Sequence, residues 1–535
     1  MRILTLSIAA IALGSCGGGG GSGGGGNSGG GGSTPPPAPT PTSTPASFAI
    51  QVEEGQQSTF QIQTVYDGAA GAQIYPEFVV NGSAFAIVGA PQISGNTISA
   101  TFRTRPFMPG GTTQNTVDFK ICGTSDCSTV IANSAKSYNV QVAVKLDDWA
   151  NFQRNNHNDG YVAVRYNTDD FAHAWTWSDS YARGRIFPAA ANDGRVFIVA
   201  GPDGGIPFAG PTRVIALASD TGTPEWAYNL GNQRYASGPS LSDGLLHVTS
   251  MEGSSAANPQ WALDAQTGTL VNKMSFASQW SQFSQPAAVD GMVYVAGGYY
   301  GGWLYAFDAV AGNLKWFKQP LNANIGSGQS IAIDDNYLYY YAGISIMRFD
   351  RSSGAAAGSI PDMESMRTMM DYESGPLLDG RGNVYFFSQD TRFGGRNQIV
   401  GASLDNMAVT WRTASSEYTT SFAYRDGIIY AGDQENRRLV ALDARDGSIL
   451  WATDLPTAYP EVGTNDAIYG NVIATENHIF VSSTRKTWAI DLVGSDHEIV
   501  WEADTGGCLI ITPDNHLITV GFRDFSKLTA YRLAP

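Results

Sequence analysis

The sequence predicts an all-β protein, an eight-bladed β-propeller preceded by a small Ig-like β-sandwich. A pattern of about 40 to 50 residues recurs along the C-terminal part of the chain, which is the length of one four-stranded propeller blade. Each copy opens with a short apolar run, turns at Asp-Gly or an equivalent, and continues into an aromatic-rich strand, and Asp-Gly between apolar runs favours a hairpin. The eight openings are Pro188, Pro239, Pro286, Ser330, Pro376, Ser421, Gly470 and Leu509.

The second half of each copy approximates apolar-x-Ala-x-Asp-x-x-Thr-Gly-x-x-x-Trp. It is clearest in residues 304–316 and 439–451, and residues 214–226 keep it with Ala218 in place of the first Asp. Asp and Gly suit the tight turn between the third and fourth strands, and we expect the closing Trp to pack between neighbouring blades. These copies resemble the quinoprotein-type, or PQQ-like, propeller repeat across residues 149–535.

The ends of the repeat region predict how the ring closes. The last copy ends on residues 528–533, a third strand with no fourth strand after it. The strand at residues 174–177 precedes the first opening, so we expect it to complete the last blade and leave no open edge. Residues 149–161, with Trp149, Arg154 and Tyr161, resemble the segment that leads into such propellers and are expected to be structural.

Residues 48–146 contain no propeller motif. Apolar and polar residues alternate with period two in residues 48–52, 58–63, 97–102, 117–121 and 138–144, with weaker strands at 78–80 and 84–88. About seven strands in so short a unit favour an Ig-like sandwich. Cys122 and Cys127 flank a short turn, and in an exported chain they are expected to form a disulfide. Cys508 is expected to be a small buried core residue.

The N-terminus resembles that of a bacterial lipoprotein. Residues 1–16 combine a charged start, an apolar stretch too short to span a bilayer, and the lipobox-like Leu13-Gly14-Ser15-Cys16. The resemblance implies cleavage before Cys16, lipidation of Cys16 and, because Gly17 follows, sorting to the outer membrane, on the periplasmic or the surface-exposed side. Residues 17–47 are rich in Gly, Ser and Pro and predict a tether. The expected domains are therefore 1–16, 17–47, 48–146 and 149–535.

Charge and motif content limit the function classes. The chain has 32 Lys and Arg against 48 Asp and Glu, a net charge of −16, which disfavours nucleic acid as a partner. The family resemblance raises the alternative of a periplasmic dehydrogenase that uses pyrroloquinoline quinone and calcium. Such enzymes typically have adjacent cysteines, which this chain lacks, and a Cys-x-x-Cys-His haem motif is also absent. The carboxylates of Asp371, Glu373, Glu461 and Asp466 show no calcium-site spacing. We expect no cofactor, no metal and no catalysis.

A binding function remains. The lipobox and the propeller together resemble the propeller lipoproteins of the outer-membrane β-barrel assembly machine, and the long tether and the sandwich depart from them. The resemblance implies a non-enzymatic, lipid-anchored scaffold of the cell envelope that binds a protein or an anionic glycan, with outer-membrane protein assembly as one specific role. A surface lipoprotein that binds glycans is the second alternative.

The candidate partner-binding residues lie in connections expected on one propeller face. Later blades carry cations there and earlier blades carry aromatics, the residue types enriched at binding hot spots. An alternative is that the arginines only pair with Asp390, Asp433, Glu435 and Asp524. The candidate residues are Arg392, Arg396, Arg437, Arg438, Arg485, Lys486, Trp280, Tyr299, Tyr300 and Trp303.

Overall fold

The structure is a computed structural model that describes residues 47–535 apart from 68–72, 180–185, 187–188, 193, 202–210, 234–235, 252–254, 279–284, 298–302, 319–324, 327–329, 342, 365–368, 371–374, 390–395, 458–465 and 522–526. Within these residues the chain is β apart from one short 3-10 helix, η1 (Thr168–Asp170), so the all-β prediction is confirmed. No helix in the described part is long and apolar enough to cross a membrane.

The N-terminal unit consists of two sheets that enclose one hydrophobic core. Side chains from both sheets meet there, including Ile62 and Phe102 from one and Phe119 and Val140 from the other. Every predicted strand is present, and the short β5 was missed because its three residues are all exposed. The first sheet has the order β1 (Ser47–Glu53), β8 (Lys136–Lys145), β7 (Gly111–Cys122), β3 (Tyr75–Asn81), and the second β2 (Thr59–Val65), β6 (Thr97–Thr104), β4 (Phe85–Ile87), with β5 (Gln92–Ser94) also on β6.

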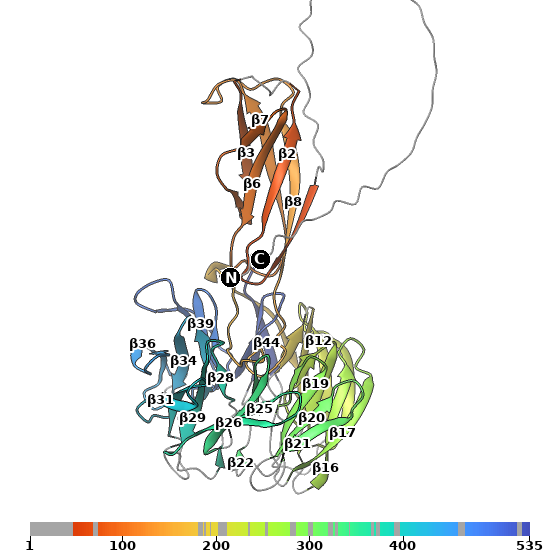
Figure 1. Ribbon diagram of the computed structural model, residues 1–535, viewed down its shortest axis with the longest axis vertical. Coiled ribbons are helices and arrows are strands. Elements are labelled where there is room, and N and C mark those ends of the chain that lie inside the picture. The colour runs from red at the N-terminus through yellow and green to blue at the C-terminus, as the bar shows by residue number, and fades with distance from the viewer. Residues whose placement is uncertain are drawn as a thin grey trace, which may run out of the picture.

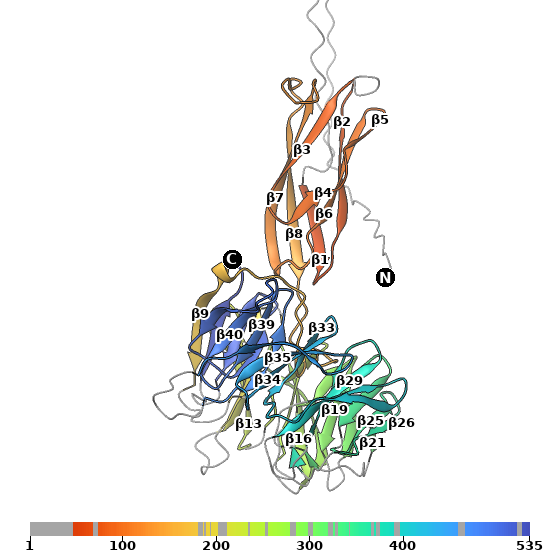
Figure 2. The ribbon, with the colours of Figure 1, turned by 90° about the vertical axis from the view of Figure 1, so that its left-hand side faces the viewer.

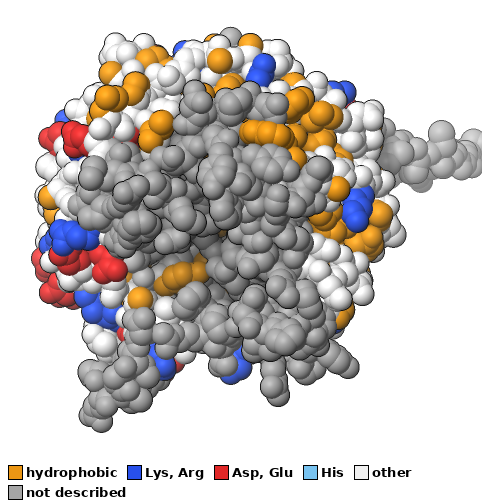
Figure 3. All heavy atoms as spheres, turned by 90° about the horizontal axis from the view of Figure 1, so that it is seen from below, with side chains coloured by type: hydrophobic (Ala, Val, Ile, Leu, Met, Phe, Trp, Pro, Cys, Tyr) orange, Lys and Arg blue, Asp and Glu red, His pale blue; other side chains and the backbone are white. Residues whose placement is uncertain are grey.

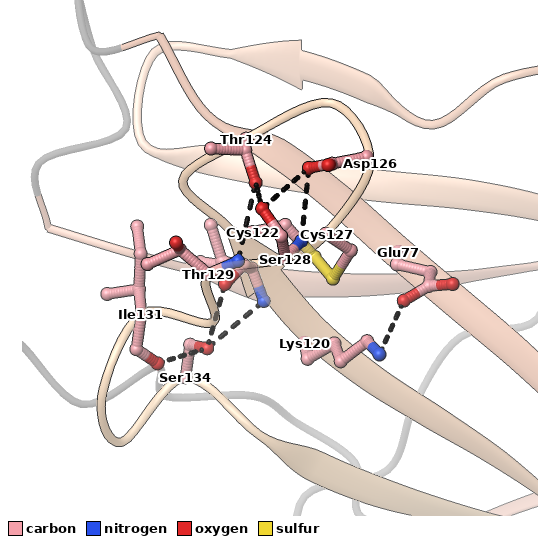
Figure 4. Close-up of a disulfide and its surroundings, with 11 residues drawn as sticks. Glu77, Lys120, Cys122, Thr124, Asp126, Cys127, Ser128, Thr129, Ile131 and Ser134 are labelled. Carbon is pink, nitrogen blue, oxygen red and sulfur yellow. Dashed lines mark hydrogen bonds and ion pairs between the residues drawn. A yellow bond between two sulfur atoms is a disulfide. The ribbon is translucent and has the colours of Figure 1, made fainter.

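A disulfide joins Cys122 and Cys127 at the turn that follows β7, as expected (Figure 4). Hydrogen bonds fix the same turn, since the backbone N–H and the hydroxyl of Ser128 both donate to Asp126 Oδ1, at 3.1 and 2.8 Å. A side-chain hydrogen bond from Thr124, together with those from Ser128, lowers the pKa of Asp126 to about 2. Glu77 lies beside the two sulfur atoms, but a disulfide offers no thiolate to a metal.

The C-terminal part of the described chain forms eight four-stranded antiparallel sheets in sequence order, which fit a propeller (Figures 1 and 2). They are the first sheet, β10 (Ala190–Asn192), β11 (Arg195–Ala200), β12 (Thr212–Ala218), β13 (Pro224–Gly231); the second, β14 (Ser240–Ser242), β15 (Leu245–Thr249), β16 (Ser255–Asp264), β17 (Leu270–Ser278); the third, β18 (Ala287–Val289), β19 (Met292–Gly297), β20 (Trp303–Asp308), β21 (Leu314–Lys318); and the fourth, β23 (Ala332–Ile333), β24 (Tyr337–Tyr341), β25 (Ser345–Asp350), β26 (Ala356–Pro361).

The remaining four sheets follow the same plan. They are the fifth, β28 (Leu377–Leu378), β29 (Asn383–Gln389), β30 (Asn397–Ser403), β31 (Ala408–Arg412); the sixth, β33 (Ala423–Arg425), β34 (Ile428–Asp433), β35 (Arg438–Asp443), β36 (Ile449–Asp454); the seventh, β38 (Ile473–Ala474), β39 (His478–Ser482), β40 (Thr487–Asp491), β41 (Ile499–Ala503); and the eighth, β42 (Cys508–Ile511), β43 (His516–Val520), β44 (Lys527–Arg532), β9 (Ala172–Ser178). Short parallel pairs, β22 (Ile325–Gly326) with β27 (Met369–Met370) and β32 (Thr420–Ser421) with β37 (Gly470–Asn471), link successive sheets.

The closing tryptophans of the repeat pack between neighbouring sheets, as predicted. Four of the indole N–H groups donate to a carbonyl in the turn between the third and fourth strands of the next sheet. A Cβ added to the glycine of that turn would lie 2.4 or 2.5 Å from the Trp ring. This close approach explains why the repeat needs both Trp and Gly. The donors and acceptors are Trp175 to Ser219, Trp226 to Ala265, Trp316 to Arg351 and Trp411 to Ala444. Trp451 instead stacks on His497 of the seventh sheet, with ring centroids 4.0 Å apart.

The eighth sheet combines strands from both ends of this region. β9 pairs with β44 in antiparallel register, with Trp177 opposite Leu528, which confirms the predicted closure. β9 also carries Trp175, whose indole N–H donates to Ser219 of the first sheet at 2.8 Å. A second bond crosses the same seam, from the Ser219 hydroxyl to Asp514 at 2.6 Å. One strand therefore supplies both the missing edge and the contact to the next sheet.

Residues 149–162, here called the ring segment, bind the innermost strand of seven sheets in turn. Trp149 pairs with Ala191 of the first sheet, and Asn151 exchanges two hydrogen bonds with Ala288 of the third. Carbonyl groups of the segment accept backbone N–H groups from the second, fourth, fifth, sixth and seventh sheets, which are those of Leu241, Ile333, Leu378, Tyr424 and Ala474. The segment thus holds the inner edges together, in agreement with its expected structural role.

The ring segment reaches the eighth sheet through side chains. Asn471 donates to Gln153 Oε1 at 2.7 Å and to the carbonyl of Leu509 at 3.0 Å, and its own oxygen accepts the Leu509 N–H. Positive φ angles at Gln153, Arg154 and Asn158 turn the segment sharply. Such angles are uncommon for residues other than glycine and persist where surrounding contacts hold them.

The N-terminal unit stands on one end of the eight sheets and is fastened to the ring segment (Figure 1). Glu54, in the turn after β1, forms an ion pair with Arg154, and both side chains are only 6% exposed. The same carboxylate accepts backbone N–H groups from Asp147 at 3.0 Å and Ala163 at 2.6 Å. Gly110 and Asn515 exchange two further bonds, each of 2.9 Å, across the junction.

The buried Glu54–Arg154 pair predicts a strong effect of one substitution. Glu54→Ala would leave the Arg154 guanidinium buried without its partner, which typically costs about 3–5 kcal/mol of folding free energy. We expect a markedly lower urea midpoint for the full chain. The matched control is Glu225→Ala, which removes a partly exposed ion pair with Arg195 and should cost under about 1 kcal/mol. Equal midpoints for the two variants would contradict the assigned role of Glu54.

Candidate partner-binding face

The sheets have two ends, and the candidate residues lie at the end away from the N-terminal unit. The turns between first and second strands face that unit, because Asn515 in one such turn exchanges hydrogen bonds with Gly110 of the N-terminal unit. Strands alternate in direction, so the connections between second and third strands lie at the opposite end. We call this end the distal face, and Figure 3 views the molecule from that side.

The structure describes six of the ten candidate residues. Arg392, Trp280, Tyr299 and Tyr300 lie outside the described residues. Arg396, Arg437, Arg438, Arg485 and Lys486 lie in or beside the connections between second and third strands of the fifth, sixth and seventh sheets, and Trp303 begins β20 of the third sheet. The cations therefore occupy three adjacent sheets, and Trp303 lies two sheets before them.

Carboxylates accompany the cations of the distal face. Arg396 pairs with Glu435, and both side chains are more than a third exposed. Arg438 Nε lies 3.1 Å from Asp433 Oδ2, and the Asp433 side chain is buried. Glu435 and Asp433 are both among the carboxylates with which the arginines are expected to pair if they bind no ligand. Lys486 lies 2.8 Å from Glu502 and 3.3 Å from Asp504.

Arg437 is the most firmly held of the described cations. Its Nη2 lies 2.5 Å from Asp466 Oδ2 and donates to the carbonyl of Pro456 at 2.9 Å, and its Nη1 donates to the Asp466 carbonyl. The Asp466 side chain is almost fully buried. Sequence reasoning did not foresee this pair, because the two residues belong to different connections 29 positions apart.

These pairs give the distal face charges of both signs rather than a basic patch. The hydrogen bonds that Lys486 donates to Glu502 and to Asp504 raise its pKa despite its desolvation. Figure 3 shows Lys and Arg beside Asp and Glu along one side of this face and hydrophobic side chains along another. A surface of this kind suits a protein partner with complementary charges better than a uniformly anionic ligand.

Trp303 marks the apolar part of the distal face. Its ring lies 6.3 Å from that of Tyr305 and 6.5 Å from that of Phe317, which is 45% exposed. Phe317 was missed by the sequence analysis, which considered connections rather than strands. The available signal was the position of Phe317 directly after the closing Trp316. Trp316 packs against the fourth sheet, so strand alternation turns Phe317 away from that sheet.

Of the four carboxylates considered from the sequence for a calcium site, the structure describes only Asp466. Asp371, Glu373 and Glu461 lie outside the described residues. Asp466, the fourth carboxylate, is buried and bound to Arg437. A buried carboxylate that already pairs with an arginine is poorly placed to bind a calcium ion.

The ion pairs predict that Arg437 and Arg396, which belong to adjacent sheets, differ in their contribution to stability. Arg437→Ala would leave the buried Asp466 carboxylate without its cation and should cost about 2–3 kcal/mol, at the lower end for a buried pair because Arg437 is partly exposed. Arg396→Ala breaks only an exposed pair and should cost under about 1 kcal/mol. Thermal melts of both variants check this, and a larger loss for Arg396→Ala would refute it.

The family match lies in the repeat region of the chain. The family described as "Outer membrane protein assembly factor BamB" matches residues 210–453 and 396–533, a combined span of more than half of the chain. No curated protein matches.

Three similar solved structures cover about two thirds of the chain. BamB from Moraxella catarrhalis is 16% identical, with a TM-score of 0.49, covering 68% of this chain and 99% of its own. The computationally designed Ika8 protein is 12% identical, with a TM-score of 0.48 and coverages of 66% and 98%. Saccharomyces cerevisiae Sqt1 is 11% identical, with a TM-score of 0.49 and coverages of 67% and 98%. On the family match, the chain belongs to the family of outer membrane protein assembly factor BamB.

Proposed function

We propose that the protein is a non-enzymatic, lipid-anchored scaffold of the cell envelope that holds a protein partner on its distal face during outer-membrane protein assembly. Membership of the BamB family supports the assembly role. The observation that carries the proposal is the composition of the distal face, where paired charges of both signs lie in the same face as the partly exposed Phe317. Aromatic anchors with charged surroundings are typical of protein interfaces.

The proposed architecture is an eight-bladed propeller at residues 149–535 and an Ig-like sandwich at residues 48–146. Eight four-stranded sheets in sequence order, with β9 closing the last, support the blade count. Two sheets over one core support the sandwich. Its first and last strands, β1 and β8, pair in parallel, so the unit begins and ends within the same sheet.

The proposed anchor is a lipid on Cys16, with residues 1–16 as the signal and residues 17–47 as the tether. This proposal is based on the sequence, since residues 1–46 lie outside the described part and Ser47 already begins β1. Attachment at Cys16 and sorting to the outer membrane would place the tether on the membrane side of the N-terminal unit. The distal face lies at the other end of the molecule, where a partner can reach it.

A protein partner is favoured over an anionic glycan by the pairing of the cations. Arg396, Arg437, Arg438 and Lys486 each have a carboxylate partner within the chain. A polyanion would have to displace these carboxylates, whereas a protein surface can match both signs. The alternative of a quinone-dependent dehydrogenase is tested by dye reduction with pyrroloquinoline quinone, calcium and an alcohol, in which the scaffold should be inactive.

The anchor proposal predicts the behaviour of Cys16→Ser. Without the thiol the precursor cannot be lipidated, so we expect either unprocessed precursor or release of the protein from washed membranes. Fractionation and intact-mass measurement check this result. Cys508→Ser is the control, because Cys508 is buried in the eighth sheet and should not affect attachment. A mature, membrane-bound Cys16→Ser protein would exclude the lipid anchor.

The partner proposal predicts face-selective crosslinking in cells. A photo-crosslinking amino acid at Phe317 or Arg396 of the distal face should trap a component of the machinery that inserts β-barrel proteins, identified by mass spectrometry. The same amino acid at Asp335, an exposed turn residue at the other end of the fourth sheet, is the matched control. Equal trapping from Asp335, or none from the distal positions, would contradict the proposal.

A further inference from the structure

A polar groove lies between the fifth and sixth sheets, at the end that faces the N-terminal unit. Its volume is about 710 Å³, within the range of about 300–1,000 Å³ typical of small-ligand sites. One wall comes from the turn between β28 and β29, with Asp379 and Arg381. The other comes from the turns of the sixth sheet, with Asp426 and Arg445.

Two carboxylates of the groove are already occupied. Asp379 accepts the N–H groups of Arg381 and Asn383 at 2.7 and 3.0 Å, the Asn383 amide at 2.7 Å and the Tyr385 hydroxyl at 3.3 Å. Asp443 accepts from the Arg445 side chain, which lowers its pKa to about 2. These bonds shape the walls and leave other groups for a ligand.

The remaining polar groups lie on opposite walls. Arg381 is exposed and, within the described part of the chain, its guanidinium makes no ion pair. Asp426 is 70% exposed, and its carboxylate is 3.4 Å from the Nε of Arg425. One wall therefore offers hydrogen-bond donors and the other offers acceptors. Leu450, 49% exposed on β36, adds an apolar surface.

The floor of the groove is rigid. The rings of Tyr385 and Tyr424 are stacked at a centroid distance of 6.0 Å and an interplanar angle of 20°, and both residues are largely buried. Burial raises the pKa of each hydroxyl, so both remain protonated at neutral pH. A fixed floor between donor and acceptor walls is a preorganised site.

The charges of the groove limit the ligand class. Its lining contains Asp379, Asp426 and Asp443 against Arg381 and Arg445, which disfavours an anion. A sugar hydroxyl both donates and accepts, so an oligosaccharide can bond Arg381 on one wall and Asp426 on the other, and a C–H face of a ring can cover Leu450. We propose that this groove is a second binding site, for an uncharged oligosaccharide of two or three rings. It lies at the opposite end from the distal face and does not depend on the proposed partner.

Calorimetry on the full chain in detergent tests the site, with maltotriose, cellotriose and triacetylchitotriose as probes. We expect saturable binding of at least one, with a Kd on the order of 1 mM. Arg381→Ala and Asp426→Ala should each weaken it by about tenfold or more, the equivalent of about 1.4 kcal/mol. Both residues are exposed, so Arg381→Ala should leave the melting temperature unchanged. Asp426→Ala should lower it only slightly, because Asp426 has a φ of 50° that alanine adopts less readily.

Matched controls are Arg105→Ala, an exposed arginine of the N-terminal unit, and Asp335→Ala, in the equivalent turn of the fourth sheet. Both should bind like the unchanged protein. The site is refuted if no probe binds saturably, or if binding survives Arg381→Ala and Asp426→Ala. Crosslinking from the distal face should be the same in all four variants, so failure here leaves the partner proposal standing.

Discussion

The ring segment is the contact on which the rest of the fold depends. Each sheet bonds mainly to itself, and neighbouring sheets meet through side chains such as Trp226 and Trp411. Residues 149–162 add main-chain bonds to seven inner strands and reach the eighth through Asn471. Glu54 neutralises the buried Arg154 within this segment, so the N-terminal unit stabilises the centre of the sheets as well as standing on them. The two units are therefore joined through a buried ion pair.

The groove and the distal face follow from the same geometry. First-to-second and third-to-fourth turns gather at the end that carries the N-terminal unit, and the longer connections gather at the other end. Tight turns such as Asp379–Arg381 bring fixed polar groups beside a rigid tyrosine pair, which suits a small ligand. Longer connections bring ion pairs across sheets, as between Arg396 and Glu435, which suits a broad partner. One repeat thus produces two surfaces of different character.

Local sequence patterns predicted the fold well, because the residues of each pattern lie within a single repeat. Asp243-Gly244 has the positive φ angles at both residues that its hairpin requires, and closing tryptophans such as Trp411 pack between neighbouring sheets, as expected from the repeat. The strand β9 was predictable because an unpaired third strand needs a fourth. The site was less predictable, because pairs such as Arg437–Asp466 join separate connections. The Glu54–Arg154 pair was invisible for the same reason, as its partners are 100 positions apart.

The pairing of β9 with β44 also sets an order of events during folding. Ala172 lies opposite Arg532, so the eighth sheet cannot form until nearly the whole described chain has been synthesised. Until then β43 and β9 both present open strand edges, which invite pairing with other chains. Such distant pairing is intrinsically slow. A nascent molecule therefore passes through an interval in which these two edges are open to aggregation.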